Sequence, residues 1–370
     1  MSKKGLVLVY DPHNLLQFIW YYATYGKDKK WDAFCLPNAD KGEYMSEYCK
    51  KSEIFENIIR DEKEFLNAPL VEQMKIFSKM LGFAVIGKQE DFCKKMLSQY
   101  VNLNEYDEFV VLADVGLISG MIIALSNHKK VVILEDGTGD YVIRSNKNII
   151  KNITSFANWQ GYLLSKMGYS NVGHVYPLKP TKNCIKFSSH PETMPYQAYE
   201  KHEKLFDFRN TDMLLYDEII NKVYEKITTY DFEEFDTVLF TCNLADFVKY
   251  TGELQKRTED YVSIKSKNIL LKKHPRDSMA YDFSNCVEVD QSIPAEVMLS
   301  KIKGKKIIFM QATSIMLYMN SNEYDSECLY YDNLYDESLR ETTFRNYSTE
   351  NELIDSLKKF KYEDIEIVHI

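Results

Sequence analysis

Apolar runs and amphipathic segments alternate along most of the chain. The apolar runs are short, rich in β-branched residues and nearly continuous, which is typical of parallel strands that are buried on both faces. The segments between them have the spacing of helices that cover such strands. Strands are expected at residues 6–10, 83–86, 109–113, 131–134, 237–241, 268–271, 286–289 and 306–310. Helices are expected at residues 14–25, 70–80, 92–100, 117–126, 212–227, 295–303, 314–319 and 350–359.

Two series of strands, separated by a polar stretch, predict two domains. Alternation of strands and helices on this scale favours an α/β fold with two doubly wound, Rossmann-like sheets. Residues 176–209 are polar, contain several prolines and lack periodicity, which predicts a hinge at residues 185–210. We therefore expect a first domain at residues 1–195 and a second at residues 196–370. The acidic, tyrosine-rich residues 323–337 are expected to form a solvated loop or a sheet edge.

Charge and cysteine content exclude several classes of protein. The 46 Lys and Arg residues are outnumbered by 55 Asp and Glu residues, and the net charge of −9 argues against a nucleic-acid partner. The seven cysteines are scattered and never spaced as CxxC, so neither a disulfide framework nor a structural zinc site is expected. Because no apolar run reaches the ~20 residues of a membrane span, we expect a cytoplasmic protein. Peripheral association with the inner face of the cell membrane and a homodimer both stay open.

The residues that follow the predicted strands are the candidates for a site, because open α/β sheets bind ligands at the carboxyl ends of their strands. Glu135, Asp136 and Gly137 directly follow the strand at 131–134, and Gly139 completes a tight loop. Two neighbouring carboxylates repel each other's ionised forms, which suits one of them to act as a general base. A polar turn is the simpler alternative. The loop lacks the third glycine of a dinucleotide fingerprint and has too few oxygen ligands for a calcium site.

A cationic group follows a strand of the second series. After residues 268–271 come Lys272, Lys273, His274, Pro275 and Arg276. The proline ends the hydrogen bonding of the strand and holds the preceding histidine extended. An imidazole between cationic side chains suits an anionic phosphate, to which it can donate a hydrogen bond or a proton. A basic surface turn is the alternative.

Hydroxyl and carboxylate side chains follow two further elements of the second series. Thr313 and Ser314 come after its last predicted strand and begin a predicted helix, whose amino-terminal amides favour an anion. Glu296 lies in the first turn of the predicted helix 295–303, where an acid is stabilising whatever its function. Simple helix capping is the alternative at both places. His13 follows the first strand and either faces a cleft shared by the two sheets or lies in a turn.

At these residues the chain resembles the bacterial sialyltransferases of the GT-B architecture, in which two Rossmann-like domains face a central cleft. The shared pattern is an acidic-acidic-glycine motif, then a His-Pro motif and then a paired hydroxyl motif. The resemblance is closest to glycosyltransferase family 52 and the related bacterial polysialyltransferases. The three motifs are Glu135-Asp136-Gly137, His274-Pro275 and Thr313-Ser314.

The resemblance implies inverting transfer of sialic acid from CMP-sialic acid to a glycan hydroxyl of the capsule or lipooligosaccharide type, without a metal or cofactor. It implies that the first domain binds the acceptor and supplies the base, Glu135 or, as second choice, Asp136. It implies that the second domain binds the CMP-sugar, with His274 assisting departure of the phosphate. The substrate-binding residues that it implies are Lys272 near the cytosine, Glu296 at the ribose, and Thr313 and Ser314 at the phosphate, together with Pro275, Gly137 and His13.

Two alternatives stay open at this level. The same fold could use another CMP-nonulosonic acid or a UDP-sugar as donor. It could also belong to a glycan-binding protein whose site is catalytically inactive, since a fold by itself does not fix a function.

Overall fold

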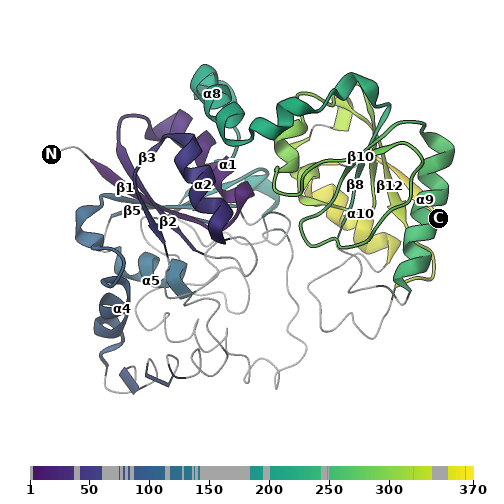
Figure 1. The fold of residues 1–370 in the computed structure, drawn as a ribbon. Coiled ribbons are helices and arrows are strands. Elements are labelled where there is room, and N and C mark those ends of the chain that lie inside the picture. The colour runs from purple at the N-terminus through teal and green to yellow at the C-terminus, as the bar shows by residue number, and fades with distance from the viewer. Residues whose placement is uncertain are drawn as a thin grey trace. The chain divides into compact units, whose positions relative to one another are not determined.

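The structure is a computed structural model and describes residues 3–36, 42–60, 75, 78–79, 82–83, 87–112, 117–126, 129–135, 137, 141, 184–194, 201–242, 248, 250–319, 321–335, 349–362 and 364–370. Its contacts divide the chain into two compact units. The first comprises Met1–Asp136, Arg144–Pro191 and Tyr196–Val223, and the second comprises Gly137–Ile143, Glu192–Pro195 and Tyr224–Ile370. Each unit is built on one parallel sheet (Figure 1).

The first sheet has seven parallel strands in the order β3-β2-β1-β4-β5-β6-β7. The strand order reverses between β1 and β4, which is where a doubly wound sheet opens a crevice at the carboxyl ends of its strands. The strands are β1 (Lys4–Val9), β2 (Lys30–Cys35), β3 (Phe55–Arg60), β4 (Glu108–Leu112), β5 (Lys130–Leu134), β6 (Cys184–Ser188) and β7 (Lys201–Lys204).

Helices cover both faces of the first sheet. On one face, α4 (Gln89–Leu97) and α5 (Leu117–Leu125) pack on a core that includes Leu8, Phe109 and Ile133. The alternate strand residues point to the opposite face, where α1 (Pro12–Tyr21) and α2 (Gly42–Ser52) contact the strands and α8 (Met213–Val223) contacts α1 and α2. Asp11 caps α1 by accepting a hydrogen bond of 2.9 Å from the amide of Asn14, which fixes where the chain turns from β1 into the helix.

The second sheet has six parallel strands in the order β10-β9-β8-β11-β12-β13, and its order reverses between β8 and β11. One of its faces packs on α9 (Thr251–Lys265) through Leu239 and Ile308, and the other packs on α10 (Glu350–Lys359) through Ile307 (Figure 1). Its strands are β8 (Thr237–Phe240), β9 (Ile269–Lys272), β10 (Cys286–Glu288), β11 (Lys306–Phe309), β12 (Asp325–Tyr330) and β13 (Glu366–His369).

Buried carboxylates at the amino ends of the strands are held by cations and phenols. In the first unit, Glu108 accepts hydrogen bonds from Tyr21, Lys29 and Lys130. Burial acts to raise the pKa of the Glu108 carboxyl, but these partners outweigh burial and lower it. In the second unit, Lys306 and Tyr261 bind Glu327 in the same way. Both buried carboxylates therefore have hydrogen-bond partners within the protein.

The predicted α/β fold with two doubly wound sheets is confirmed. Every predicted strand except the one at 83–86 coincides with an observed strand to within two residues, and α10 has the bounds that the sequence predicts. Thr349 and Glu352 form a capping box at the start of α10. Most of the predicted strand 83–86 and of the predicted helix 70–80 lies outside the described residues.

Three expectations about the chain's organisation differ from the structure. The hinge expected at 185–210 contains most of β6 and all of β7, which pair with each other in the first sheet. The chain leaves the first unit after Val223, beyond the boundary expected at 195. The expected loop or edge at 323–337 contains β12, which lies between β11 and β13 and buries Cys328. Of the acids in this strand, Asp325 is exposed, and Glu327 is buried with Lys306 and Tyr261 as partners.

His369 joins the end of the second sheet to two carboxylates. Its Nδ1 lies 3.0 Å from Asp332 Oδ1, and its Nε2 lies 3.4 Å from Glu350 Oε1. The hydrogen bond with Asp332 is the largest of the effects that raise the pKa of His369 above its ordinary value. A raised pKa in the folded state gives stability that is fully present below the unfolded pKa and is lost as pH rises through the folded pKa.

We therefore expect His369→Gln to lower the free energy of unfolding at about pH 5.5, below the unfolded histidine pKa of about 6.5, and to change little at about pH 8.5. Because the side chain is half exposed, the loss should be about 0.5 kcal/mol. Urea denaturation at the two pH values measures it. An equal loss at both pH values would show that ring packing against Tyr330, rather than charge, is what His369 contributes.

Candidate active site

Glu135 directly follows β5 at the carboxyl edge of the first sheet, and its side chain is fully buried. The backbone amide of Ser189 donates a hydrogen bond of 2.6 Å to Glu135 Oε2, and the Ser189 hydroxyl donates one of 3.1 Å to Oε1. Ser189 directly follows β6, the parallel neighbour of β5. The two strand ends therefore hold the carboxylate in one orientation. Asp136, the other predicted acid, lies outside the described residues.

His13 is connected to the backbone of Glu135 through Gln17, one turn further along α1. Gln17 Nε2 lies 2.8 Å from His13 Nε2 and donates a hydrogen bond of 3.1 Å to the Glu135 carbonyl. Because the amide nitrogen is the donor, His13 Nε2 is the acceptor, and the neutral ring carries its proton on Nδ1. The structure thus brings His13 and Glu135 together at one edge of the first sheet.

His274 lies in the turn after β9, at the carboxyl edge of the second sheet. Its amide donates a hydrogen bond of 2.9 Å to Thr241 Oγ1, and its Nδ1 accepts one of 3.1 Å from the amide of Arg276. The proton of the neutral ring is therefore on Nε2. Pro275 stands inside this turn, which the amide of Asp277 closes by donating to the His274 carbonyl at 2.8 Å. His274 and Pro275 thus have a fixed backbone at the end of β9.

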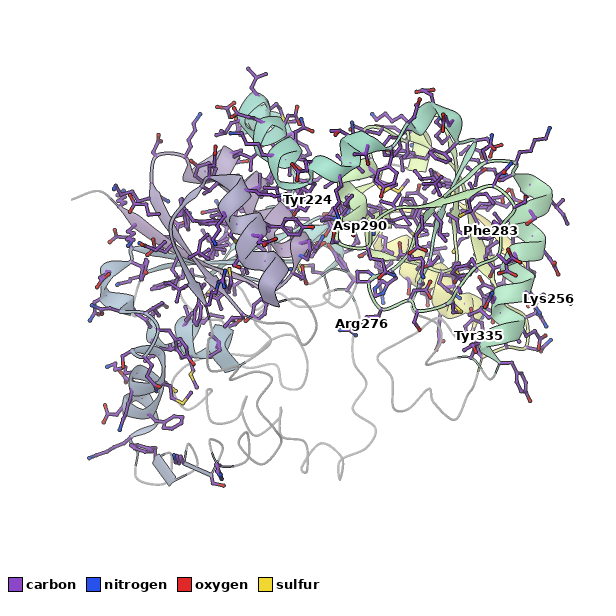
Figure 2. All side chains as sticks on the ribbon, in the orientation of Figure 1. Tyr224, Lys256, Arg276, Phe283, Asp290 and Tyr335 are labelled. Atoms are coloured by element: carbon purple, nitrogen blue, oxygen red, sulfur yellow. The ribbon has the colours of Figure 1, made fainter. Side chains whose placement is uncertain are left out.

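Lys272, the last residue of β9, is buried, and its Nζ lies 3.3 Å from the carbonyl oxygen of Asp290 and 3.4 Å from those of Lys273 and Gln291. These contacts join the ends of β9 and β10. Figure 2 labels Arg276 and Asp290, which come from the two loops that follow these strands. Burial of Asp290 acts to raise its pKa, but Lys226 and Ser292 outweigh burial and lower it to about 2. The ion pair between Lys226 and Asp290 therefore helps to hold the loop after β10.

Thr313 follows β11, and its hydroxyl is buried without a hydrogen-bond partner among the described residues. The side chain does not cap the following turn, so the alternative of simple helix capping is wrong for Thr313. The helix expected at 314–319 is one 3-10 segment, Ser314–Tyr318, and the helix expected at 295–303 begins as the 3-10 segment Ala295–Met298. Both segments are too short to provide the anion site that the amino-terminal amides of an α-helix form.

Glu296 and Gly137 both belong to the neighbourhood of Ser314. The 3-10 segment that contains Glu296 contacts the one that begins at Ser314. Gly137, which belongs to the second unit, has φ of +62°, and a Cβ on it would lie 3.3 Å from Ser314 Cβ. A glycine is needed here both for the left-handed backbone and for the close approach. The acidic-acidic-glycine motif and the paired hydroxyl motif thus meet at Gly137 and Ser314.

A family model for the alpha-2,8-polysialyltransferases (POLYST) matches residues 1–322. The chain belongs to this family. It is accordingly a glycosyltransferase, and the predicted resemblance to polysialyltransferases is confirmed, whereas membership of family 52 stays a prediction. No curated protein matches the sequence.

Solved structures similar to this family member have low sequence identity. The spinosyn rhamnosyltransferase SpnG is 9% identical with a TM-score of 0.46, over 99% of this chain and 97% of that chain. MurG of Acinetobacter baumannii is 10% identical with a TM-score of 0.42, over 99% and 85% of the two chains. A UDP-N-acetylglucosamine 2-epimerase from Rickettsia bellii is 11% identical with a TM-score of 0.45, over 97% and 88%. Likenesses of this size carry no argument about function.

Two further findings concern the described part of this polysialyltransferase-family chain. No helix in it is both long and apolar enough to cross a membrane. No group of three or more His, Cys, Asp or Glu side chains in it could hold a metal ion. Metal independence stays a prediction.

Three residues that build the site were not among the predicted site residues. Ser189 and Gln17 hold Glu135, and Thr241 holds the backbone of His274. Ser189 follows a strand that the sequence analysis did not predict, and Gln17 lies within a helix, away from any strand end. Only Thr241 stood at a predicted strand end, where its role could have been anticipated.

Gly137→Ala should cost roughly 1–2 kcal/mol of folding free energy for the left-handed backbone. If the predicted nucleotide site lies at Gly137 and Ser314, the variant should also bind CMP more weakly, because the added methyl group would lie 3.3 Å from Ser314 Cβ. Gly304→Ala is the matched control, since Gly304 has φ of +77° but nothing within 4 Å of an added Cβ. Denaturation and titration calorimetry with CMP measure the two effects. Equal CMP affinity in the two variants would contradict a nucleotide site at Gly137 and Ser314.

Proposed function

We propose that this protein transfers sialic acid from CMP-sialic acid to a hydroxyl of a glycan acceptor, with inversion at the anomeric carbon and without a metal ion. The acceptor that the family's description favours is a sialic acid chain extended through α-2,8 linkages. The observation that carries the proposal is the buried Thr313 hydroxyl, which has no partner among the described residues and lies one residue from the Gly137–Ser314 contact. A buried, unsatisfied hydroxyl is costly unless a ligand supplies its partner.

The second unit supplies the donor site in this proposal. The Nε2–H of His274 and the hydroxyls of Thr313 and Ser314 donate hydrogen bonds to the phosphate of CMP, Glu296 binds the ribose, and Lys272 orders the loop beside the cytosine. Because Nδ1 of His274 accepts the Arg276 amide, the ring favours hydrogen-bond donation from Nε2 over transfer of a proton. CMP leaves as a phosphate monoester whose second pKa is about 6, so it needs charge stabilisation more than protonation.

The first unit supplies the base. The Glu135 carboxylate takes the proton of the acceptor hydroxyl as that oxygen forms its bond to the anomeric carbon of sialic acid. The bond between this carbon and the phosphate oxygen breaks, and its electron pair leaves with CMP. His13 contacts the acceptor near Glu135. Glu135 is two residues from Gly137 in the sequence, which supports this assignment.

The proposal is tested by incubating the protein with CMP-sialic acid and a short α-2,8-linked sialic acid oligomer in the presence of EDTA. We expect chain extension, a rate that falls by roughly 10²–10³ in His274→Ala, and loss of extension in Glu135→Gln with CMP binding retained. Asp136→Asn should be far milder than Glu135→Gln. The reverse order would move the base to Asp136, and absence of both extension and donor hydrolysis across a broad acceptor set would favour a glycan-binding protein.

Donor identity is tested by thermal denaturation with nucleotides, because a ligand that binds only the folded state raises its stability. CMP should raise the melting temperature of the protein by much more than UMP or GMP does. A larger effect of UMP would instead indicate a UDP-sugar donor.

Thr313→Val separates the cost of the buried hydroxyl from its use. Removing an unsatisfied hydroxyl should raise the free energy of unfolding of the ligand-free protein by about 1 kcal/mol and weaken CMP binding about tenfold. Thr258→Val is the control, since its buried hydroxyl donates to the Leu254 carbonyl at 2.8 Å and lies 2.9 Å from Tyr331 OH. The control should lose stability and keep CMP affinity. A Thr313 variant that loses stability and still binds CMP normally would contradict the phosphate site.

A further inference from the structure

Ser189 is in contact with Glu135 through both of its hydrogen-bond donors. The amide and the hydroxyl reach different oxygens of the carboxylate, at 2.6 Å and 3.1 Å. Glu135 is fully buried, and Ser189 is 4% exposed, so water does not weaken these bonds. A carboxylate gripped at both oxygens by one residue cannot rotate about its terminal torsion without losing a charge-assisted bond.

The backbone of Glu135 is held as firmly as its side chain. Lys186, which is buried in β6, donates from Nζ to the Leu134 carbonyl at 3.1 Å, and Gln17 donates to the Glu135 carbonyl at 3.1 Å. Three side chains from two elements thus fix one residue at the end of a strand. Such over-determination is expected of a reacting group, since a misplacement of 1 Å can cost about 10² in rate.

We propose that Ser189 is the positioning residue of the catalytic carboxylate, orienting Glu135 and favouring its ionised form through the Ser189 hydroxyl. This inference rests on the proposed function, in which Glu135 is the base. Each carboxylate oxygen accepts up to two hydrogen bonds, so the two donors of Ser189 occupy one site on each oxygen. In this role the Ser189 hydrogen bonds stay in place while Glu135 takes the proton of the acceptor hydroxyl.

The hydroxyl can be removed without removing the amide. In Ser189→Ala the amide still donates to Oε2, but Oε1 loses a partner that favours the charged form. Loss of a hydrogen bond to a charged group is expected to change a rate constant by roughly tenfold to hundredfold. We expect kcat to fall by that factor, KM for CMP-sialic acid to stay unchanged, and the acidic limb of the pH–rate profile to move to higher pH.

Ser188→Ala is the matched control. Ser188 is the preceding residue and is also buried, and its hydroxyl has no hydrogen-bond partner among the described residues. Its removal takes away the same atom from the same strand end without touching Glu135. We expect wild-type kcat and an unmoved pH profile. Ser189→Thr, which keeps the hydroxyl, should recover most of the activity that Ser189→Ala loses.

The outcomes separate this inference from the proposed function. If Glu135→Gln is inactive while Ser189→Ala keeps the wild-type rate and pH profile, the positioning role is overturned and the base stands. If Ser189→Ala and Ser188→Ala lose equal activity with unmoved profiles and lowered melting temperatures, Ser189 is only structural. If Glu135→Gln keeps full activity, Glu135 is not the base, and the inference fails together with that assignment while CMP binding still tests the donor site.

Discussion

A strand in the middle of a parallel sheet has to end, and its last backbone groups then lose the partners that the hydrogen-bond ladder supplied. At the carboxyl edge of the first sheet, side chains replace those partners: Lys186 binds the Leu134 carbonyl, and Gln17 binds the next one. At the same edge of the second sheet, Thr241 accepts from the amide of His274. Buried backbone groups must be paired, so polar side chains are required here. Once present, they fix the orientation of the residues that can react.

At the opposite edges of the sheets, buried polar groups are also paired, but by residues that have no proposed part in the reaction. Glu108 and Glu327 are buried carboxylates near the amino ends of their strands, and each is surrounded by cations and a phenol. Removing one partner of such a group is strongly destabilising, because the remaining charge is left buried. At the carboxyl edge of the second sheet, in contrast, the Thr313 hydroxyl is buried without a partner among the described residues. A ligand that supplied this partner would remove the cost of burying the hydroxyl.

The sequence was sufficient for strands made mostly of apolar residues and insufficient for strands that carry more charge, for physical reasons. Strands such as β5 and β8 are buried on both faces and consist mostly of apolar residues. The strands that were missed carry charge: Asp32 in β2 is neutralised by Lys4, Lys186 in β6 is buried, and β7 is a polar edge strand. Composition cannot reveal a charge that a distant partner satisfies. Among the helices, α9 was missed because only three of its 15 residues are buried, Leu254, Thr258 and Val262.

The candidate site divides in the same way. Glu135 directly follows a buried strand, and His274 and Thr313 follow buried strands by two and four residues, so the rule for open sheets found them. Ser189 and Gln17 were not found, because one follows an unpredicted strand and the other reaches the site from a helix. The helices expected at 295 and 314 are short 3-10 segments, whose apolar residues Met298 and Met316 pack in the core.

The central claim is that the carboxyl edge of the second sheet binds the phosphate of CMP. A crystal structure of the protein soaked with CMP tests it most directly. The account predicts phosphate oxygens within hydrogen-bond distance of His274 Nε2 and Thr313 Oγ1, with the ribose beside Glu296. Clear density for CMP at any other place, with Thr313 still without a partner, would contradict it.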